Sequence, residues 1–361
     1  ARIPTIAGAL RTALKGEHTI TYSPGIAAAG SGREEEEEDR AARAAAVNLA
    51  KRSDAIVLAL GDTASTAGEW SDRSSFELPT SHAALLHALG ATGKPLILVL
   101  IGGRPTTFGG ARGDMLLTNT SSLLFSFPTG QEGAEAISRI IVGEASPGGR
   151  LAHAWPRHAG PSTWLQPISG KWRTHTWRRA AAFGGGGVDG GGGGRDDKEE
   201  GLDDGSSRYG SYVDSGVPSP LFPFGYGLSY HRCSLQHLTI TSAGGGDVGG
   251  SSAAATATIA RATLEVRPAA ASLNGCTEVV QCYTRDPIMK HIRREKRLVA
   301  FSRVALQPGE RLRHVRLNLT SESMALLDDV GKWRVMPGEY ELSCGVSSAD
   351  PSALEARWRV W

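Results

Sequence analysis

Residues 54–61 read DAIVLALG, a short and continuous apolar run that ends in glycine. A run of this kind is typical of a strand that is buried on both faces of a sheet. Two similar runs follow, PLILVLI at residues 95–101 and SLLFSF at residues 122–127. Helical patterns over residues 79–91 and 131–142 come after the first and third runs. Buried strands that alternate with helices predict βαβ units and a mostly parallel sheet, so we expect residues 1–165 to form an α/β layered domain.

The chain before the first run contains an acidic stretch. Residues 34–38 are five consecutive glutamates, and an alanine-rich stretch over residues 41–51 follows them. Carboxylates near the amino end of a helix interact favourably with the helix dipole. We therefore expect a helix in this region that ends near Arg52.

The second half of the chain has a different pattern. Residues 183–207 consist mainly of glycine and charged residues, which cannot form a core, and they predict a flexible insertion. After Cys233 apolar and polar residues alternate, and two Pro-Gly-Glu turns interrupt the alternation. The expected strands are residues 256–266, 277–284, 298–306, 311–319, 338–345 and 354–360. Strands at this spacing without intervening helices predict an antiparallel β-sandwich of fibronectin III or immunoglobulin type.

Composition excludes several classes of function. The 361 residues carry a formal net charge of +2, so the protein as a whole is not suited to bind nucleic acid. A basic stretch over residues 285–303 lacks interleaved aromatic residues, and we expect it to be a solvated face or an interdomain contact. No apolar run reaches the ~18–20 residues that cross a bilayer, which excludes an integral membrane protein.

The cysteines and the first residues of the chain give information on the cellular compartment of the protein. Four cysteines in 361 residues are too few for the disulfide framework of a small secreted domain, and no Cys-x-x-Cys pair favours zinc or dithiol chemistry. The chain starts at Ala1 with no signal-peptide pattern, so we expect that a segment was removed or that the chain is part of a longer protein. Asn-x-Ser/Thr sequons at Asn119 and Asn318 are compatible with secretion.

The candidate site lies where the first predicted strand ends, because ligands of an open parallel sheet bind beyond the carboxyl ends of its strands. The polar segment there carries three carboxylates, a tryptophan and an arginine: Asp62, Glu69, Asp72, Trp70 and Arg73. A carboxyl group beside an aromatic face can have its pKa raised by desolvation, as a proton donor to a sugar oxygen requires. Trp70 and Asp62 are candidates for contact with a sugar ring. The alternative is that Glu69 and Asp72 are solvated loop acids with Arg73 as their surface partner.

The second predicted strand ends in a Gly-Gly-Arg-Pro segment. Arg104 in this segment could place a guanidinium group at a domain interface. A turn that exposes a surface arginine is the interpretation that the local sequence favours.

The motifs of the chain resemble glycoside hydrolase family 3. The resemblance rests on an ordered set that spans nearly the whole chain: GEWSDR at residues 68–73, TGKP at 92–95, GRP at 103–105, PTGQEG at 128–133, PGGRL at 147–151 and PFGYGLSY at 223–230. Later segments, EVVQ at 278–281 and LVAF at 298–301, resemble the fibronectin III-like tail of that family. The resemblance implies an α/β sandwich domain over residues 1–232, with an insertion at about 183–207, and a fibronectin III-like domain over residues 233–361.

The resemblance also implies a reaction. Family members are β-glucosidases or β-xylosidases that retain configuration through a covalent glycosyl-enzyme intermediate, with one carboxylate as nucleophile and a second carboxyl group as acid and then base. Glu69 matches the position of the acid/base, with Asp72 and Arg73 as supporting residues. The substrate is an oligosaccharide or a β-glycoside, and the resemblance implies no metal and no organic cofactor.

This sequence departs from the family pattern in one respect. The nucleophile of the family is an aspartate on an N-terminal β/α barrel, and nothing in residues 1–361 has the pattern of its ~250 residues. We therefore expect this chain to supply the acid/base part of a longer, secreted, extracellular or vacuolar enzyme, with glucose favoured over xylose. The alternative from another class is a non-catalytic carbohydrate-binding or scaffolding protein that has lost the barrel.

Overall fold

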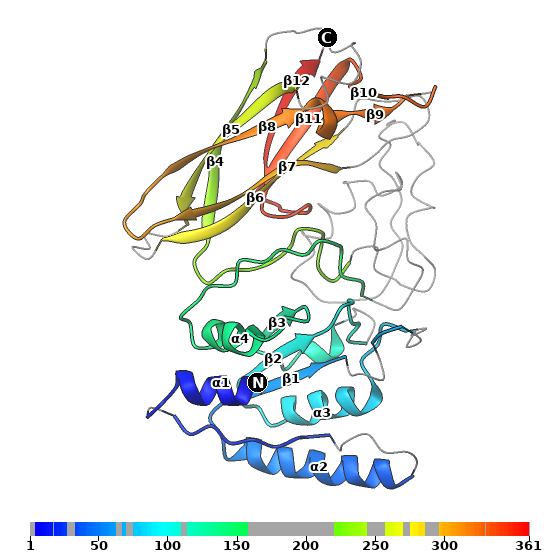
Figure 1. Ribbon diagram of the computed structural model, residues 1–361, viewed down its shortest axis with the longest axis vertical. Coiled ribbons are helices and arrows are strands. Elements are labelled where there is room, and N and C mark those ends of the chain that lie inside the picture. Colours follow the sequence, from blue (N-terminus) through cyan, green and yellow to red (C-terminus); the bar gives the residue numbers. More distant parts are fainter. Residues whose placement is uncertain are drawn as a thin grey trace, which may run out of the picture. The chain divides into compact units, whose positions relative to one another are not determined.

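A computed structural model describes residues 4–16, 18–26, 33–62, 67–69, 75–109, 114–157, 220–243, 257–269, 275–285, 296–328 and 330–360. The chain divides into two compact units (Figure 1). Unit 1 comprises Ala1–Ser146 and Trp155–Pro161, and unit 2 comprises Pro147–Ala154 and Ser162–Trp361. The predicted insertion at 183–207 lies outside the described residues.

Unit 1 is built on a parallel sheet of three strands in the order β1-β2-β3. The strands are β1 (Ile56–Gly61), β2 (Leu96–Ile101) and β3 (Ser122–Ser126). Ile56 pairs with Leu96, and Ile97 pairs with Ser122, so all three strands run in the same direction. The three apolar runs therefore form strands at the predicted positions, and the prediction of a parallel sheet is confirmed.

Helices of unit 1 pack in pairs. They are α1 (Ile6–Ala13), α2 (Arg33–Lys51), α3 (Thr80–Gly90), the short 3-10 helix η1 (Met115–Leu117) and α4 (Gly133–Ile141). α1 packs against α4 and α2 packs against α3, and Figure 1 shows α2 and α3 together on one side of the sheet. The predicted helices correspond to α2, α3 and α4, whereas α1 and η1 were not anticipated because they are short.

Burial differs between the central strand and the edge strand of this sheet. Leu96, Leu98 and Val99 in β2 are fully buried. In β1, by contrast, Val57 is 38% exposed and Ala59 is also exposed. The prediction that residues 54–61 are buried on both faces is therefore wrong for β1, because its position at the edge of the sheet leaves one face less covered.

The described residues of unit 2 form two antiparallel sheets. The first has the order β12-β11-β6-β7 and the second has the order β4-β5-β8, and a two-stranded ribbon pairs β10 with β9. The strands are β4 (Cys233–Ser242), β5 (Thr258–Pro268), β6 (Cys276–Arg285), β7 (Arg297–Leu306), β8 (Arg313–Thr320), β9 (Leu326–Leu327), β10 (Trp333–Arg334), β11 (Gly338–Gly345) and β12 (Leu354–Val360). A one-turn helix, α6 (Ser321–Met324), follows β8.

The core of unit 2 is made by alternate residues of both sheets. Ala262 and Leu264 of β5 are fully buried, as are Val280 of β6 and Leu342 of β11, and all four belong to one apolar cluster. Alternation therefore places every second side chain inside, as expected for two packed sheets. The predicted β-sandwich is confirmed, and its six predicted strands correspond to β5, β6, β7, β8, β11 and β12.

Two disulfide bonds stabilise unit 2. Cys233 at the start of β4 is bonded to Cys276 at the start of β6, which joins the two sheets. Cys282 of β6 is bonded to Cys344, its direct partner on β11. This pairing of the cysteines was not predicted from the sequence. All four cysteines lie in the predicted sandwich, and this clustering could have indicated disulfide bonds within that domain.

Two segments outside the strands are fastened to β6. Leu151 donates its N–H to the carbonyl of Tyr226 over 2.9 Å, and Gly225 donates to the carbonyl of Leu151 over 2.8 Å. The Gln281 side chain of β6 donates to the carbonyl of Gly225 over 3.0 Å. A buried ion pair joins Arg150 to Glu278, three residues before Gln281 in β6. The segments around residues 150 and 225 therefore pack as part of unit 2.

Candidate functional site

The carboxyl edge of the parallel sheet is held in register by backbone hydrogen bonds beyond the strands. Asp62 follows β1 and donates its N–H to the carbonyl of Ile101 over 2.9 Å. Gly102 follows β2 and donates to the carbonyl of Ser126 over 3.1 Å. At Gly61 a Cβ atom would lie 1.8 Å from the Ile101 oxygen, so only glycine fits this close approach of two strands.

An ion pair links the ends of the first two strands at this edge. The Arg104 Nε atom lies 3.7 Å from Asp62 Oδ2, and the two side chains are 27% and 15% exposed. The prediction that Arg104 is a surface arginine in a turn misses this contact. The two residues are 42 positions apart in the sequence, and only the parallel pairing of β1 with β2 brings them together.

Glu69 lies on the segment that follows Asp62. Residues 67–69 are exposed, and Gly68 has a positive φ of 128°, a backbone conformation that favours glycine. An exposed carboxylate on this segment is accessible to a ligand that arrives from outside the unit. Trp70, Asp72 and Arg73 lie outside the described residues, so their predicted grouping with Glu69 stays a prediction.

The residues that follow the Glu69 segment pair with the residues that follow β2. Thr107 donates its N–H to the carbonyl of Phe76 over 2.8 Å, and Glu77 forms a parallel bridge with Thr107. The side chains of Leu78 and Phe108 beside this bridge are buried. Both ends of the segment that carries Glu69 are therefore anchored to the framework of unit 1.

A group of aromatic residues lies at the carboxyl end of β3. Phe125 packs edge-to-face with Phe127 and with Trp155, with ring centroids 4.8 Å and 4.7 Å apart. The Trp155 indole is fully buried and donates its Nε1–H to the carbonyl of Thr106 over 2.7 Å. Phe127 is 48% exposed and presents an apolar surface at this end of β3. Three further tryptophans of the sequence, Trp164, Trp172 and Trp177, lie outside the described residues.

Neither a metal site nor a membrane span is found in the part of the chain that the structure describes. No group of three or more His, Cys, Asp or Glu side chains there is arranged to hold a metal ion. No helix among the same residues is long and apolar enough to cross a bilayer.

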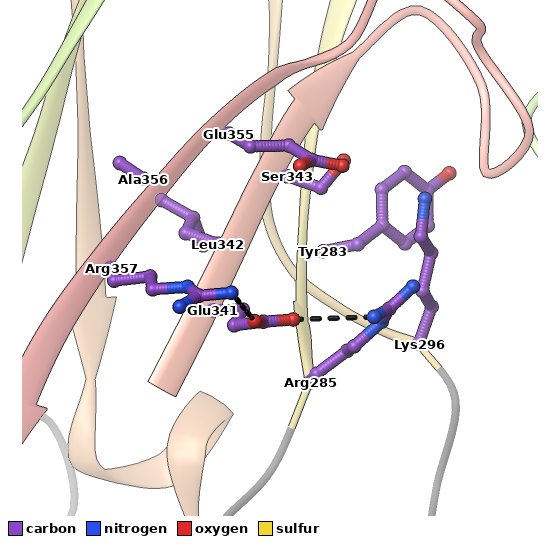
Figure 2. A pocket seen from close by; sticks show the side chains of 9 residues that line it. All are labelled: Tyr283, Arg285, Lys296, Glu341, Leu342, Ser343, Glu355, Ala356 and Arg357. Atoms are coloured by element: carbon purple, nitrogen blue, oxygen red, sulfur yellow. Dashed lines mark hydrogen bonds and ion pairs between the residues drawn. The ribbon is translucent and has the colours of Figure 1, made fainter. Parts of the chain in front are cut away.

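A depression on unit 2 is lined mainly by charged side chains (Figure 2). Glu341 lies between two arginines, 2.6 Å from Arg357 Nη2 and 3.2 Å from Arg285 Nη1, and Lys296 donates to the carbonyl of Ser348. The depression has a volume of about 30 Å³, far below the ~300 Å³ of a small ligand pocket. These charges interact with one another, so this cluster is a structural feature of the sheet surface.

The described residues define an α/β unit with a parallel sheet, followed by a fibronectin III-like β-sandwich. Residues 3–230 match the family described as Glycosyl hydrolase family 3 C-terminal domain, and residues 278–348 match the Fibronectin type III-like domain. The chain therefore belongs to glycoside hydrolase family 3, and corresponds to the C-terminal portion of its members.

Relatives of the chain carry the names of glycosidases. The chain is 31% identical over 305 residues to a β-xylosidase of Formosa agariphila, and the match covers 84% of this chain and 35% of the relative. It is 29% identical over 306 residues to the periplasmic β-glucosidase of Salmonella typhimurium, covering 84% and 34%. The structure of a β-glucosidase involved in saponin metabolism from intestinal bacteria matches with 27% identity and a TM-score of 0.74, covering 99% of this chain and 46% of that one.

The chain spans about a third of the length of these curated relatives, which are longer proteins. The two disulfides indicate a compartment outside the cytosol, because thiols in the cytosol are kept reduced. The domain boundary at residues 232 and 233 stays a prediction, although the first family match ends close to it, at residue 230.

Proposed function

We propose that this chain is the acid/base portion of a retaining glycosidase that hydrolyses terminal, non-reducing β-D-glucosyl residues. The observation that carries the proposal is the match of residues 3–230 to the C-terminal domain of glycoside hydrolase family 3. The complete enzyme would contain an N-terminal β/α barrel with the nucleophile, as the resemblance implies. A secreted, extracellular or vacuolar protein agrees with the two disulfides and with a relative that is named periplasmic.

Glu69 is our candidate for the general acid/base. In the first step its carboxyl group would donate a proton to the glycosidic oxygen while the nucleophile attacks the anomeric carbon. In the second step the Glu69 carboxylate would take a proton from water, which hydrolyses the glycosyl-enzyme. The exposure of Glu69 supports this role, because a barrel domain could then present a sugar to it.

The neighbouring residues have proposed supporting roles. The ion pair between Asp62 and Arg104 holds the start of the Glu69 segment at the sheet edge, which would limit the positions that Glu69 can reach. Trp70 and Asp62 are candidates for sugar contacts, and Asp72 and Arg73 for adjusting the charge around Glu69. No metal or organic cofactor takes part in this scheme.

A β-xylosidase of the same family is the second candidate, because a relative at 31% identity carries that name. Glucose and xylose differ by one hydroxymethyl group, and a pocket that accommodates or excludes it sets the preference. The ratio of kcat/KM for the para-nitrophenyl β-glucoside and β-xyloside of the native enzyme discriminates the two: a ratio above one supports glucose, and a ratio below one supports xylose.

Replacing Glu69 by glutamine in the native, full-length polypeptide tests the assignment. We expect kcat/KM on glycosides with poor leaving groups to fall by ~10²–10⁴, the contribution of a general acid. The loss should be much smaller for substrates with a good leaving group, and azide should restore turnover by replacing the water that Glu69 activates. Glu77→Gln is the matched control, because it neutralises an exposed carboxylate beyond the same segment. Full activity of Glu69→Gln on unactivated glycosides would contradict the assignment, and Asp62 and Asp72 would be tested next.

A further inference from the structure

The outer face of the β4-β5-β8 sheet is polar throughout its centre. In β8, Val315, Leu317 and Leu319 point into the core and are buried, whereas Arg316 and Asn318 between them are exposed. The register places Asn318 opposite Arg261 of β5. β8 is the last strand of the three in this sheet, so Asn318 lies at an edge of the described sheet.

A shallow depression on this face is lined in part by Arg261, the residue opposite Asn318. Its volume is about 510 Å³, and its lining residues come from β4, β5, β8 and the residue after β4: Thr241, Ser242, Ala243, Thr258, Arg261, Thr263 and Arg316. Hydroxyl and guanidinium groups dominate the lining, and no aromatic ring belongs to it. Groups of this kind make hydrogen bonds to sugar hydroxyls, while a free sugar would lack the aromatic platform that usually holds it.

Asn318 begins the sequon Asn318-Leu319-Thr320, the acceptor pattern for N-glycosylation. Its Oδ1 atom accepts a hydrogen bond from Arg261 Nε over 3.1 Å. An N-linked glycan is attached through Nδ2, and the amide oxygen remains an acceptor after the modification. The contact between Asn318 and Arg261 is therefore compatible with a glycan, and it would orient the first sugar of that glycan.

The disulfides are an independent observation about the compartment in which this chain folds. Unit 2 contains Cys233–Cys276 and Cys282–Cys344, and its described residues contain no free cysteine. Disulfides of this kind form in the oxidising compartments that secreted proteins pass through. N-glycosylation takes place on proteins that enter such a compartment, so the disulfides are compatible with modification of the sequon.

We propose that Asn318 carries an N-linked glycan whose first sugars lie along the polar depression and shield the edge strand β8. In the transfer step Nδ2 attacks the anomeric carbon of a lipid-linked oligosaccharyl pyrophosphate. The N–C bond forms, the bond from the anomeric carbon to the pyrophosphate oxygen breaks, Nδ2 loses one proton, and the lipid pyrophosphate leaves. Exposed edge strands promote association with other chains, and a glycan at this position reduces that tendency.

The second sequon, at Asn119, provides an internal control. It lies after η1 in unit 1, and the hydroxyl of its third residue, Ser121, accepts the N–H of Leu96 over 3.2 Å. Asn119→Gln therefore removes a sequon and leaves the proposed glycan untouched.

Peptide mapping of the native polypeptide tests the proposal without any variant. After enzymatic release of N-glycans in ¹⁸O water, we expect the peptide that contains Asn318 to carry ¹⁸O-labelled aspartate at that position. In the secreted full chain, Asn318→Gln should remove the mass of one glycan, and Asn119→Gln should leave the Asn318 glycan in place. Recovery of the Asn318 peptide in unmodified form only would overturn the proposal.

The shielding of β8 is tested on the folded glycoprotein. We expect amide hydrogens of residues 313–320 to exchange several-fold faster after the glycan is removed enzymatically, while those of β2 in unit 1 keep their rates. Equal exchange of β8 with and without the glycan would overturn the shielding, even where Asn318 is occupied.

Discussion

Replacing Glu278 by glutamine tests whether the Arg150–Glu278 ion pair fastens residues 147–154 to the β-sandwich. The two side chains are 6% and 7% exposed, and they are 128 positions apart in the sequence. Arg150 Nη2 also donates to Ser229 Oγ over 3.2 Å, and Glu278 Oε1 also accepts the N–H of Val279 over 2.9 Å. The pair therefore joins three segments of unit 2.

The expected magnitude follows from burial. Breaking a buried pair by removing one partner costs about 3–5 kcal/mol, because the remaining charge is left without compensation in a low-dielectric environment. Glu278→Gln keeps an acceptor oxygen for Val279 and removes only the charge, so we expect a loss toward the lower end of this range. Arg150→Met removes the cation and leaves the carboxylate buried, with a similar expected loss.

A double-mutant cycle separates the pair from the effects of each side chain. Arg150→Met combined with Glu278→Gln contains no buried charge, so its loss should be smaller than the sum of the single losses by more than about 1 kcal/mol. Hydrogen exchange of β6 peptides across a urea series reports the free energy of opening for this unit alone. A coupling energy within about 0.5 kcal/mol of zero would refute the reasoning.

An exposed ion pair in unit 1 is the control for this cycle. Arg139 and Glu144 lie 3.4 Å apart with side chains that are 54% and 52% exposed. Solvent screens such a pair, so Glu144→Gln should change the free energy of unfolding by no more than about 0.5 kcal/mol. A loss as large as that of Glu278→Gln would show that burial is not the cause.

Two further predictions concern unit 2. Hydrogen bonds from Arg313 lower the pKa of Glu310 from its ordinary value of 4.5, so this carboxylate stabilises the fold above its unfolded pKa and loses that contribution as pH falls through its folded pKa. Glu310→Gln should therefore lower the urea midpoint at neutral pH and leave it unchanged in acid, and an equal loss at both pH values would contradict this. Replacing Cys282 and Cys344 together by alanine opens a loop with a sequence separation of 62 and should cost about 4 kcal/mol, measured by urea unfolding against the disulfide-bonded chain. An unchanged midpoint would show that this disulfide does not restrain the unfolded chain.

Much of the framework could be predicted from local patterns. The apolar runs at residues 54–61, 95–101 and 122–127 gave the three strands of the parallel sheet, because burial imposes a pattern that a short segment carries by itself. Strands β11 and β12 begin and end at the predicted residues, because the alternation of apolar and polar side chains defines them. The Pro-Gly-Glu turn predicted at residues 337–339 is wrong, because Gly338 and Glu339 pair with β12 as the first residues of β11. Elements without such signals, among them α1, β4 and the β9–β10 ribbon, were not predicted.

The candidate site was predicted only in part. The motif at residues 68–73 identified the segment that carries Glu69, because a motif is a contiguous stretch of the chain that can be recognised without a structure. The partner of Asp62 could not be identified in this way, because Arg104 belongs to the next strand and the sequence around it equally suits a surface turn. The exposed Phe127 and its contact with Phe125 likewise depend on where the chain turns after β3.

The sequence by itself determined the fold class, the order of the two units and the family, since hydrophobic periodicity, turn residues and motif order are all written along the chain. Only the tertiary structure decided which distant residues meet. Four cysteines allow three pairings, and the register of β6 with β11 selects Cys282–Cys344. Arg150 and Glu278 are each ordinary surface residues by sequence, and they become a buried pair because packing removes both from water. Such contacts depend on distances through space, which local sequence patterns do not encode.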